Sequence, residues 1–223
     1  MRLIRSTGLS IRFTRKSRRM ATILNRKLNL EEGEMFLVSK PLEWSSFDVV
    51  NKMRSIFHIE RIGHAGTLDK NATGLLIVCT GKKTKELSGF QELEKEYAVT
   101  MRLGERTESY DAETPVIESS DVCGLSNENI RSAIARFIGN QTQLPPMWSA
   151  AKVRGKRLYK YARKGVEVER RPRDVYIRNI AVTRIAVPDV EMTVVCSKGT
   201  YVRTLVNDIG LDLGVGAHVA ALS

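Results

Sequence analysis

The chain has 223 residues, of which 42% are hydrophobic and 27% charged, a composition typical of a folded globular protein. No apolar run approaches the roughly 18 residues that a membrane-spanning helix needs, so we expect no membrane partner. The three cysteines are far apart and form no CxxC pair, which argues against a disulfide framework and a zinc site. Cys79 and Cys196 lie in apolar runs and read as core residues, which indicates a reducing compartment and hence the cytoplasm.

The formal net charge of +11 points to a polyanionic partner, and its distribution is uneven. Residues 1–30 hold nine Lys and Arg and no acid, so the remaining chain carries 27 basic and 25 acidic residues. Within that remainder, residues 150–178 have 11 basic and 3 acidic side chains, whereas residues 86–128 have 3 and 11. The basic stretch is what a phosphate-binding surface would look like, although a solvated charged face is the alternative.

The N-terminal stretch 1–19 is rich in Arg, contains Ser and Thr, and lacks acids. It fits a disordered basic arm that touches RNA, an organellar transit peptide, or an upstream extension with Met20 as the true start. We expect residues 1–30 to be a disordered extension and residues 31–223 to form one folded domain.

The apolar pattern predicts most of the regular structure. In chain order it indicates a strand at 35–39, a helix at 46–57, a Gly-rich loop at 63–74, a strand at 75–79, a short Lys-rich helix ending near 88, a strand at 97–103, a helix at 127–137, an extended break at 143–147, a helical turn at 159–164, a hairpin of strands 175–187 and 190–196, and a helix at 200–213. Strands interleaved irregularly with helices indicate an α+β fold.

The most informative segment is Gly63-His64-Ala65-Gly66-Thr67-Leu68-Asp69, followed by Ala72, Gly74 and Leu75. It reads as a loop that presents one carboxylate between a helix and a buried strand, with glycines that allow tight backbone geometry and close approach of a substrate. On composition alone, Asp69-Lys70-Asn71 could equally be a surface turn.

This segment resembles the signature of the TruB family of pseudouridine synthases, Gly-His-x-Gly-Thr-Leu-Asp with Ala and Gly at fixed offsets. Lys70 stands where the family usually has Pro. The resemblance runs from about Glu34 to Leu222 and covers further blocks in the family order: Lys40-Pro41 with Trp44 to Asp48, Lys95-Glu96-Tyr97, Gly104 with Thr107 and Asp111, Gln143 to Pro146 with Ser149, Ala150 and Lys152, Gly155 to Tyr159 with Ala162-Arg163, and Cys196 to Arg203 with Asp208, Gly210, Gly216 to His218 and Leu222.

The resemblance implies an α+β catalytic domain with a mixed, mostly antiparallel sheet flanked by helices and loops. It also implies that uridine at position 55 in the T-loop of tRNA becomes pseudouridine, in a reaction that needs no metal and no redox cofactor. By resemblance Asp69 is the catalytic carboxylate, and Arg203 is the guanidinium that keeps it ionised and oriented. For Arg203 the alternative is an ordinary helix-surface residue.

Three aromatic or apolar positions are implied to hold the flipped uridine. Tyr97 lies against the base and assists a late proton transfer, Tyr201 helps hold the base, and Leu222 lines the pocket. Without the resemblance, Tyr97 and Tyr201 would be packing residues and Leu222 a core leucine. His64 has three interpretations: a hydrogen-bonded turn residue, a general base, or, as the family suggests and we favour, a ring that stacks where the flipped base has left.

The basic segment is expected to contact phosphates and so to set affinity and salt dependence; it comprises Lys152, Arg154, Lys156, Arg157, Lys160 and Arg163. The expected partner is the T-arm of tRNA, and we expect a monomer. The alternatives are a tRNA-binding folding factor with dispensable or lost catalysis and an RNA-guided synthase of a ribonucleoprotein. Many family members continue past the position of Leu222 with basic residues or a small RNA-binding domain, so for a chain ending at Ser223 we expect weakened tRNA affinity.

Overall fold

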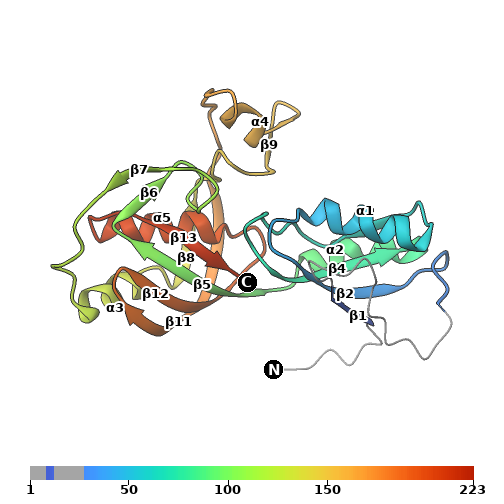
Figure 1. The fold of residues 1–223 in the computed structure, drawn as a ribbon, viewed down its shortest axis with the longest axis horizontal. Helices are drawn as coiled ribbons and strands as arrows, with labels where there is room; N and C mark the ends of the chain where they lie inside the picture. The colour runs from blue at the N-terminus through green and yellow to red at the C-terminus, as the bar shows by residue number, and fades with distance from the viewer. Residues whose placement is uncertain (1–8, 13–27) are drawn as a thin grey trace. The chain divides into compact units, whose positions relative to one another are not determined.

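The computed structural model describes residues 9–12 and 28–223 and divides into two compact units (Figure 1). Unit 1 comprises the described residues up to Leu93 together with Ser223, and unit 2 runs from Glu94 to Leu222. Among the described residues, no helix is long and apolar enough to cross a membrane.

Unit 1 is built on a four-stranded sheet in the order β1-β2-β4-β3. The strands are β1 (Leu9–Arg12), β2 (Met35–Lys40), β3 (Ile62–His64) and β4 (Gly74–Thr80). Strand β4 lies antiparallel to both β2 and β3, whereas β1 lies parallel to β2. Because β2 alternates buried and more exposed residues, one face of this sheet is available to pack against a helix.

Helix α1 (Ser46–Phe57) covers the buried face of that sheet. Its start is fixed by a capping box, in which the Ser45 hydroxyl accepts from the Asp48 backbone and the Asp48 carboxylate accepts from the Ser45 backbone. Met53 packs with Phe36 and Val78 in a core that has almost no solvent exposure. A 3₁₀ turn, η1 (Gly81–Glu86), and a short helix, α2 (Leu87–Gln91), complete the unit.

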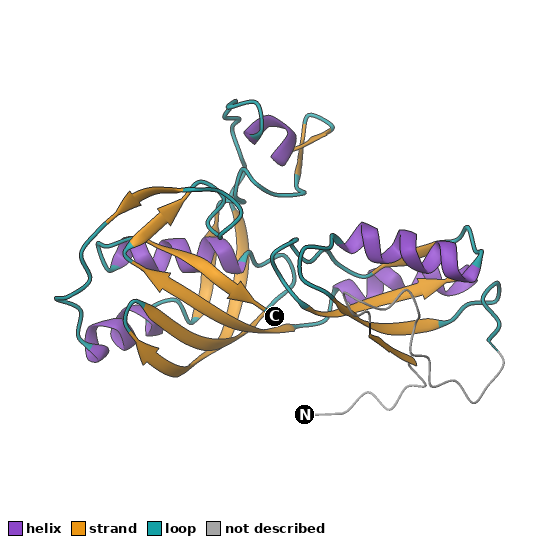
Figure 2. Ribbon diagram, in the orientation of Figure 1, coloured by secondary structure: helices purple, strands orange, loops and turns teal. Residues whose placement is uncertain are grey.

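Unit 2 is built on a five-stranded antiparallel sheet in the order β13-β5-β12-β11-β8 (Figure 2). Its strands are β5 (Lys95–Leu103), β8 (Gly139–Gln143), β11 (Arg173–Ala186), β12 (Asp189–Cys196) and β13 (Ala217–Leu222). Helices α3 (Asn127–Ala135) and α5 (Val202–Asp212) pack on one face of the sheet and enclose the larger core. The start of α5 and the ends of β5 and β13 carry the predicted catalytic and pocket residues of this unit.

Unit 2 also contains two smaller two-stranded ribbons. Strands β6 (Glu105–Thr107) and β7 (Val116–Ser119) pair with each other, as do β9 (Lys152–Val153) and β10 (Lys156–Arg157). Helix α4 (Tyr159–Ala162) follows β10, and Figure 1 shows this hairpin and helix projecting from the sheet of unit 2.

The predicted α+β class and mostly antiparallel sheet are confirmed. The predicted helices at 46–57, 127–137 and 200–213 are α1, α3 and α5, and the predicted hairpin is β11–β12. Two expectations need correction. The predicted loop 63–74 begins inside β3, because Gly63 and His64 pair with β4, and the expected Lys-rich helix is mostly the 3₁₀ turn η1.

Our expectation of a disordered extension over residues 1–30 mostly concerns positions outside the described residues. Within that stretch the structure has strand β1, which pairs with Phe36 to Ser39 of β2. The expected single domain 31–223 spans both compact units, so its treatment as one catalytic domain stays a prediction.

Gly210 gives a test of the packing between α5 and β13. A Cβ atom at Gly210 would lie 2.2 Å from the backbone nitrogen of Ala217, which cannot move without breaking the strand. We therefore expect Gly210→Ala to lower the free energy of unfolding of unit 2 by about 1–3 kcal/mol, as overpacked substitutions do. Urea denaturation measures this. Gly124→Ala is the matched control, since a Cβ there meets nothing within 4 Å, and an equal loss in both variants would contradict the interpretation.

Candidate active site

In unit 1, the loop that carries Asp69 is held against the start of helix α1. The buried hydroxyl of Ser46 accepts from the backbone N–H of Leu68 at 2.9 Å and donates to the carbonyl of Leu68 at 3.4 Å. The loop also closes on itself, because the N–H of Ala72 donates to the carbonyl of Asp69 at 3.1 Å. Asp69 is thus flanked by a clamped residue on one side and a short turn on the other.

His64 is the last residue of β3, at the entry to this loop. Its Nδ1 contacts the carbonyl of Gly66. Gly66 has a φ of 126°, a backbone conformation that favours glycine, so the turn needs Gly at this point. The contact fits the hydrogen-bonded turn, while the general-base and RNA-stacking interpretations of His64 stay predictions.

Lys40, the last residue of β2, supports the same loop from inside unit 1. Its side chain is fully buried, and its ammonium donates to the carbonyls of Trp44 at 2.6 Å, Pro41 at 3.0 Å and Lys70 at 3.4 Å. Burial lowers the pKa of Lys40 to about 8, and the negative charges of Asp69 and then Asp48 oppose that shift. One amine therefore donates hydrogen bonds both to the β2–α1 connection and to the backbone that follows Asp69.

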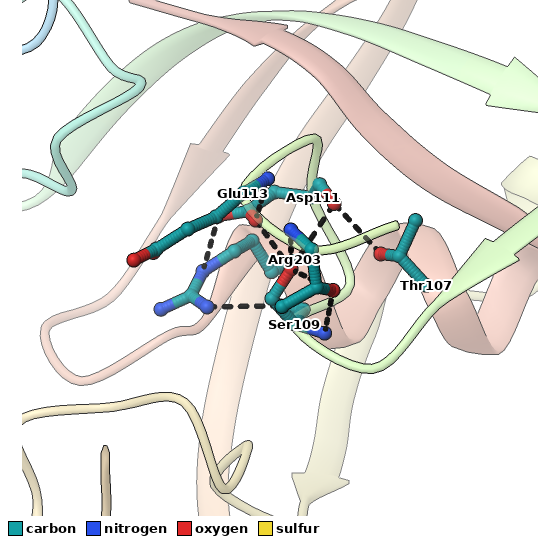
Figure 3. A network of polar contacts seen from close by, with 6 residues as sticks. Thr107, Ser109, Asp111, Glu113 and Arg203 are labelled. Carbon is teal, nitrogen blue, oxygen red and sulfur yellow. Dashed lines mark hydrogen bonds and ion pairs between the residues drawn. The ribbon is translucent and has the colours of Figure 1, made fainter. Parts of the chain in front are cut away.

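In unit 2, Arg203 lies in the first turn of α5 and is 4% exposed, so it is not a helix-surface residue. Its Nη1 donates to the carbonyl of Ser109 at 2.9 Å, and its Nε lies 3.6 Å from the Asp111 carboxylate (Figure 3). A buried guanidinium needs such partners, because desolvation of an unpaired charge is costly. The side chain is consequently held in one position.

Asp111 is itself fixed by the residues around it, as Figure 3 shows. Its carboxylate accepts from the Ser109 hydroxyl at 2.6 Å and from the backbone N–H of Glu113 at 2.9 Å. Its backbone carbonyl accepts from the Thr107 hydroxyl at 2.7 Å, and Thr107, Ser109 and Asp111 are all buried. The loop between β6 and β7 therefore supplies the polar groups that bind the Arg203 side chain.

The remaining predicted pocket residues of unit 2 lie at the ends of neighbouring elements. Leu222 on β13 is paired with Val99, and Tyr97 lies two residues before Val99 on β5, so both point to the face that bears the core. Tyr97 and Leu222 are half-buried and pack against that core. Tyr201 caps the start of α5, where the side-chain amide of Gln143 accepts from its N–H at 2.9 Å and donates to its carbonyl at 3.3 Å.

The predicted phosphate-binding residues lie on the projecting hairpin of unit 2. Register pairs Arg157 with Lys152 and Lys156 with Val153, and the turn between them has positive φ at Arg154 and Gly155. The basic side chains are exposed: Lys152, Arg154, Lys156 and Arg157. Buried Leu158 anchors the hairpin, as its N–H donates to the Ala151 carbonyl at 2.8 Å. Within residues 28–223, no group of three or more His, Cys, Asp or Glu could hold a metal ion.

Comparison with known proteins assigns the family. Residues 54–202 match the TruB family pseudouridylate synthase (N terminal domain). The chain belongs to the TruB family of pseudouridylate synthases. Among curated relatives, it is 46% identical to tRNA pseudouridine synthase B of Chlorobium chlorochromatii over 195 residues, which is 85% of this chain and 76% of that protein. Against tRNA pseudouridine synthase B of Phocaeicola vulgatus it is 45% identical, covering 87% of this chain and 86% of that protein.

Solved structures confirm the pseudouridine synthase fold. The chain resembles one in a Cbf5-Nop10-Gar1 complex with a TM-score of 0.67 and 30% identity over 86% of its own length. It also resembles one in an H/ACA RNP bound to a substrate RNA containing 2′-deoxyuridine, with a TM-score of 0.64 and 27% identity. The chain spans about half the length of these solved chains, 48% and 46%.

For this TruB family member, the structure divides the predicted site residues between the two units. Asp69 and His64 belong to unit 1, while Tyr97, Tyr201, Arg203 and Leu222 belong to unit 2. Sequence reasoning assigned no role to Lys40 or Asp111, although both lie in blocks that resemble the family. An isolated Lys before Pro and a single Asp among eleven acids give no sign that they support a loop and a guanidinium.

The lowered pKa of Lys40 gives a pH test. Because the folded-state pKa is about 8 against 10.5 when unfolded, the unfolded chain binds more protons between these values. The contribution of Lys40 to stability therefore rises as pH increases from about 8 towards 10.5. We expect the free energy of unfolding of wild type minus that of Lys40→Met to grow over this range, measured by urea denaturation. A difference that stays flat or falls would show that Lys40 is not buried as described.

Proposed function

We propose that this chain isomerises uridine to pseudouridine at position 55, in the T-loop of tRNA, with Asp69 as the catalytic carboxylate. The observation that carries the proposal is the loop of Asp69, whose sequence resembles the family signature and whose backbone is clamped by Ser46 and Lys40. The names of the curated relatives support tRNA as the substrate.

The reaction breaks the glycosidic bond between ribose C1′ and uracil N1 and forms a bond between C1′ and C5. The C5 hydrogen leaves as a proton and N1 gains one, so the product is an isomer and no oxidant or other reactant is consumed. A carboxylate is suited to this because it can attack the nucleoside or stabilise charge as the glycosidic bond breaks. Both roles require an ionised Asp69 in a fixed position.

Each of the other residues has a role in this proposal that matches its setting. The buried guanidinium of Arg203 supplies a positive charge that water screens little, which would hold a catalytic carboxylate ionised. The ring of Tyr97 lies against the flipped uracil and assists the final proton transfer, while Tyr201 and Leu222 bound its pocket. His64 stacks in the space that the base leaves.

The exposed basic hairpin of unit 2 would bind phosphates of the T-arm and make tRNA affinity dependent on salt. Its loop-and-helix surface suits a folded RNA that is recognised by shape and by a splayed base more than by duplex sequence. A synthase that acts directly on tRNA is favoured over an RNA-guided synthase. The chain is 46% identical to a tRNA pseudouridine synthase B and 30% identical to the chain in the Cbf5-Nop10-Gar1 complex. Monomeric state and cytoplasmic location stay predictions.

A tritium-release assay tests the proposal. With a tRNA transcript labelled with tritium at uridine C5, we expect wild type to release tritium, and we expect release to stop when uridine 55 is cytidine. Asp69→Asn should lower the rate by on the order of a thousandfold or more, because it removes the charge the reaction needs. Glu60→Gln is the control, since Glu60 is an exposed acid of the same unit.

The outcomes separate the proposed enzyme from its competitor. Release that persists in Asp69→Asn would show that another group performs the reaction. If wild type binds the transcript and releases no tritium, the chain acts on tRNA as a binding or folding factor. Release that persists when uridine 55 is replaced would place the target elsewhere in the RNA.

A further inference from the structure

Helix α1 presents an exposed face that the proposed catalytic roles do not use. Its buried face is made by residues such as Val49, Val50 and Met53. Phe47, Asn51 and Arg54 follow one another at spacings of four and three residues, so they form one stripe along a different side of the helix. This α1 stripe combines an aromatic ring, an amide and a guanidinium.

Phe47 is the unusual member, because 60% of this large apolar residue is exposed. Leu42, in the connection between β2 and α1, is also 46% exposed. Single exposed apolar residues are common and mean little alone. These two are informative because each is next in sequence to a residue bonded to the catalytic loop. The backbone N–H of Glu43 donates to the carbonyl of Lys70 at 2.9 Å, and the Ser46 hydroxyl accepts from the N–H of Leu68.

The stripe carries one positive charge, that of Arg54. Nη1 of Arg54 donates to the Asn51 side chain at 2.5 Å, which restrains the guanidinium on the surface of the helix. Lys70, in the catalytic loop, is a further exposed cation in the same unit. Asp48 is the acid in the first turn of α1, and its carboxylate is engaged by the Ser45 backbone and hydroxyl at 2.8 and 2.6 Å.

We propose that the α1 stripe binds one unpaired nucleotide of the RNA substrate other than the target uridine, with the base stacked on Phe47 and its phosphate paired with Arg54. This inference rests on the proposed function, since it takes tRNA as the occupant. RNA is favoured over an apolar peptide because the stripe offers one ring and, along the same side of the helix, a cation restrained by Asn51. A stacking ring and a cation are the combination that single-stranded nucleotides bind.

A physical need explains such a contact. When the target uridine leaves the stack of the loop, its neighbours lose stacking partners, and an aromatic surface close to the catalytic loop can replace them. A phosphate held beside that surface would fix the register of the RNA relative to Asp69 without reading base identity. The stripe is therefore a positioning surface, and Phe47 and Arg54 are binding residues rather than catalytic ones.

Binding of labelled tRNA transcript to the full chain tests the stripe. Phe47→Ala should weaken binding about tenfold, as loss of one stacked base does, while Phe47→Trp should keep it near the wild-type value. Arg54→Gln should reduce the slope of log Kd against log salt by about 0.7, the value for one single-stranded phosphate, and Phe47→Ala should leave that slope unchanged.

Matched controls come from unit 2, at residues with no assigned role in binding or catalysis. Ile117→Ala removes a similarly exposed apolar side chain, 57% exposed, and Arg131→Gln removes an exposed arginine on α3. The inference is overturned if Phe47→Ala binds as tightly as Ile117→Ala, if Phe47→Trp binds as weakly as Phe47→Ala, or if Arg54→Gln has the salt slope of Arg131→Gln.

Failure of this inference and failure of the proposed function give different results. If wild type releases no tritium, the proposed isomerisation fails, while the binding comparison still decides whether the stripe holds RNA. If wild type releases tritium and Phe47→Ala binds tRNA as wild type does, the proposed isomerisation is supported and the proposed RNA contact at the α1 stripe is refuted.

Discussion

The buried guanidinium of Arg203 is the constraint around which unit 2 is arranged. At 4% exposure it cannot be solvated, so the fold must supply a carboxylate and a carbonyl, and it does so through Asp111 and Ser109. That requirement shapes the connection between β6 and β7, and the loop is in turn fastened to β13, because the N–H of Val219 donates to the carbonyl of Tyr110 at 3.0 Å. A hydrophobic side chain at position 203 would need none of this, and in the proposed function the charge serves the reaction.

Unit 1 handles a buried charge in a different way. Lys40 has its ammonium surrounded by backbone carbonyls, and the acidic side chains Asp69 and Asp48 act on it through their charge. Its bonds reach the peptide after Asp69, while Ser46 holds the peptide before it. Since catalytic groups must be placed within fractions of an ångström, a loop fixed on both sides is a suitable carrier for a reactive carboxylate.

The regular elements with strong apolar periodicity were predictable from sequence, and those defined by tertiary pairing were not. Helix α1 and the β11–β12 hairpin follow from residues such as Val50 and Met53 and from the alternation in β12. Strand β8, with the sequence GNQTQ, is polar, and only its last residue falls in the predicted extended break 143–147. Its strand conformation depends on pairing with β11. The loop of Asp69 is recognised by resemblance to the family signature. The Arg203–Ser109 contact could not be found from periodicity, since it joins residues 94 apart in the chain.

In the proposed function, the Arg203–Asp111 pair is kept for chemistry rather than for stability. The most direct test replaces the pair by apolar residues, Arg203→Met with Asp111→Leu, and follows unfolding, tRNA binding and pseudouridine formation in one preparation. Because apolar replacements of a buried ion pair are often neutral or stabilising, we expect a cooperatively folded protein that binds tRNA and makes no pseudouridine. Pseudouridine formation at a rate close to that of wild type would contradict the claim and reduce the pair to a structural contact.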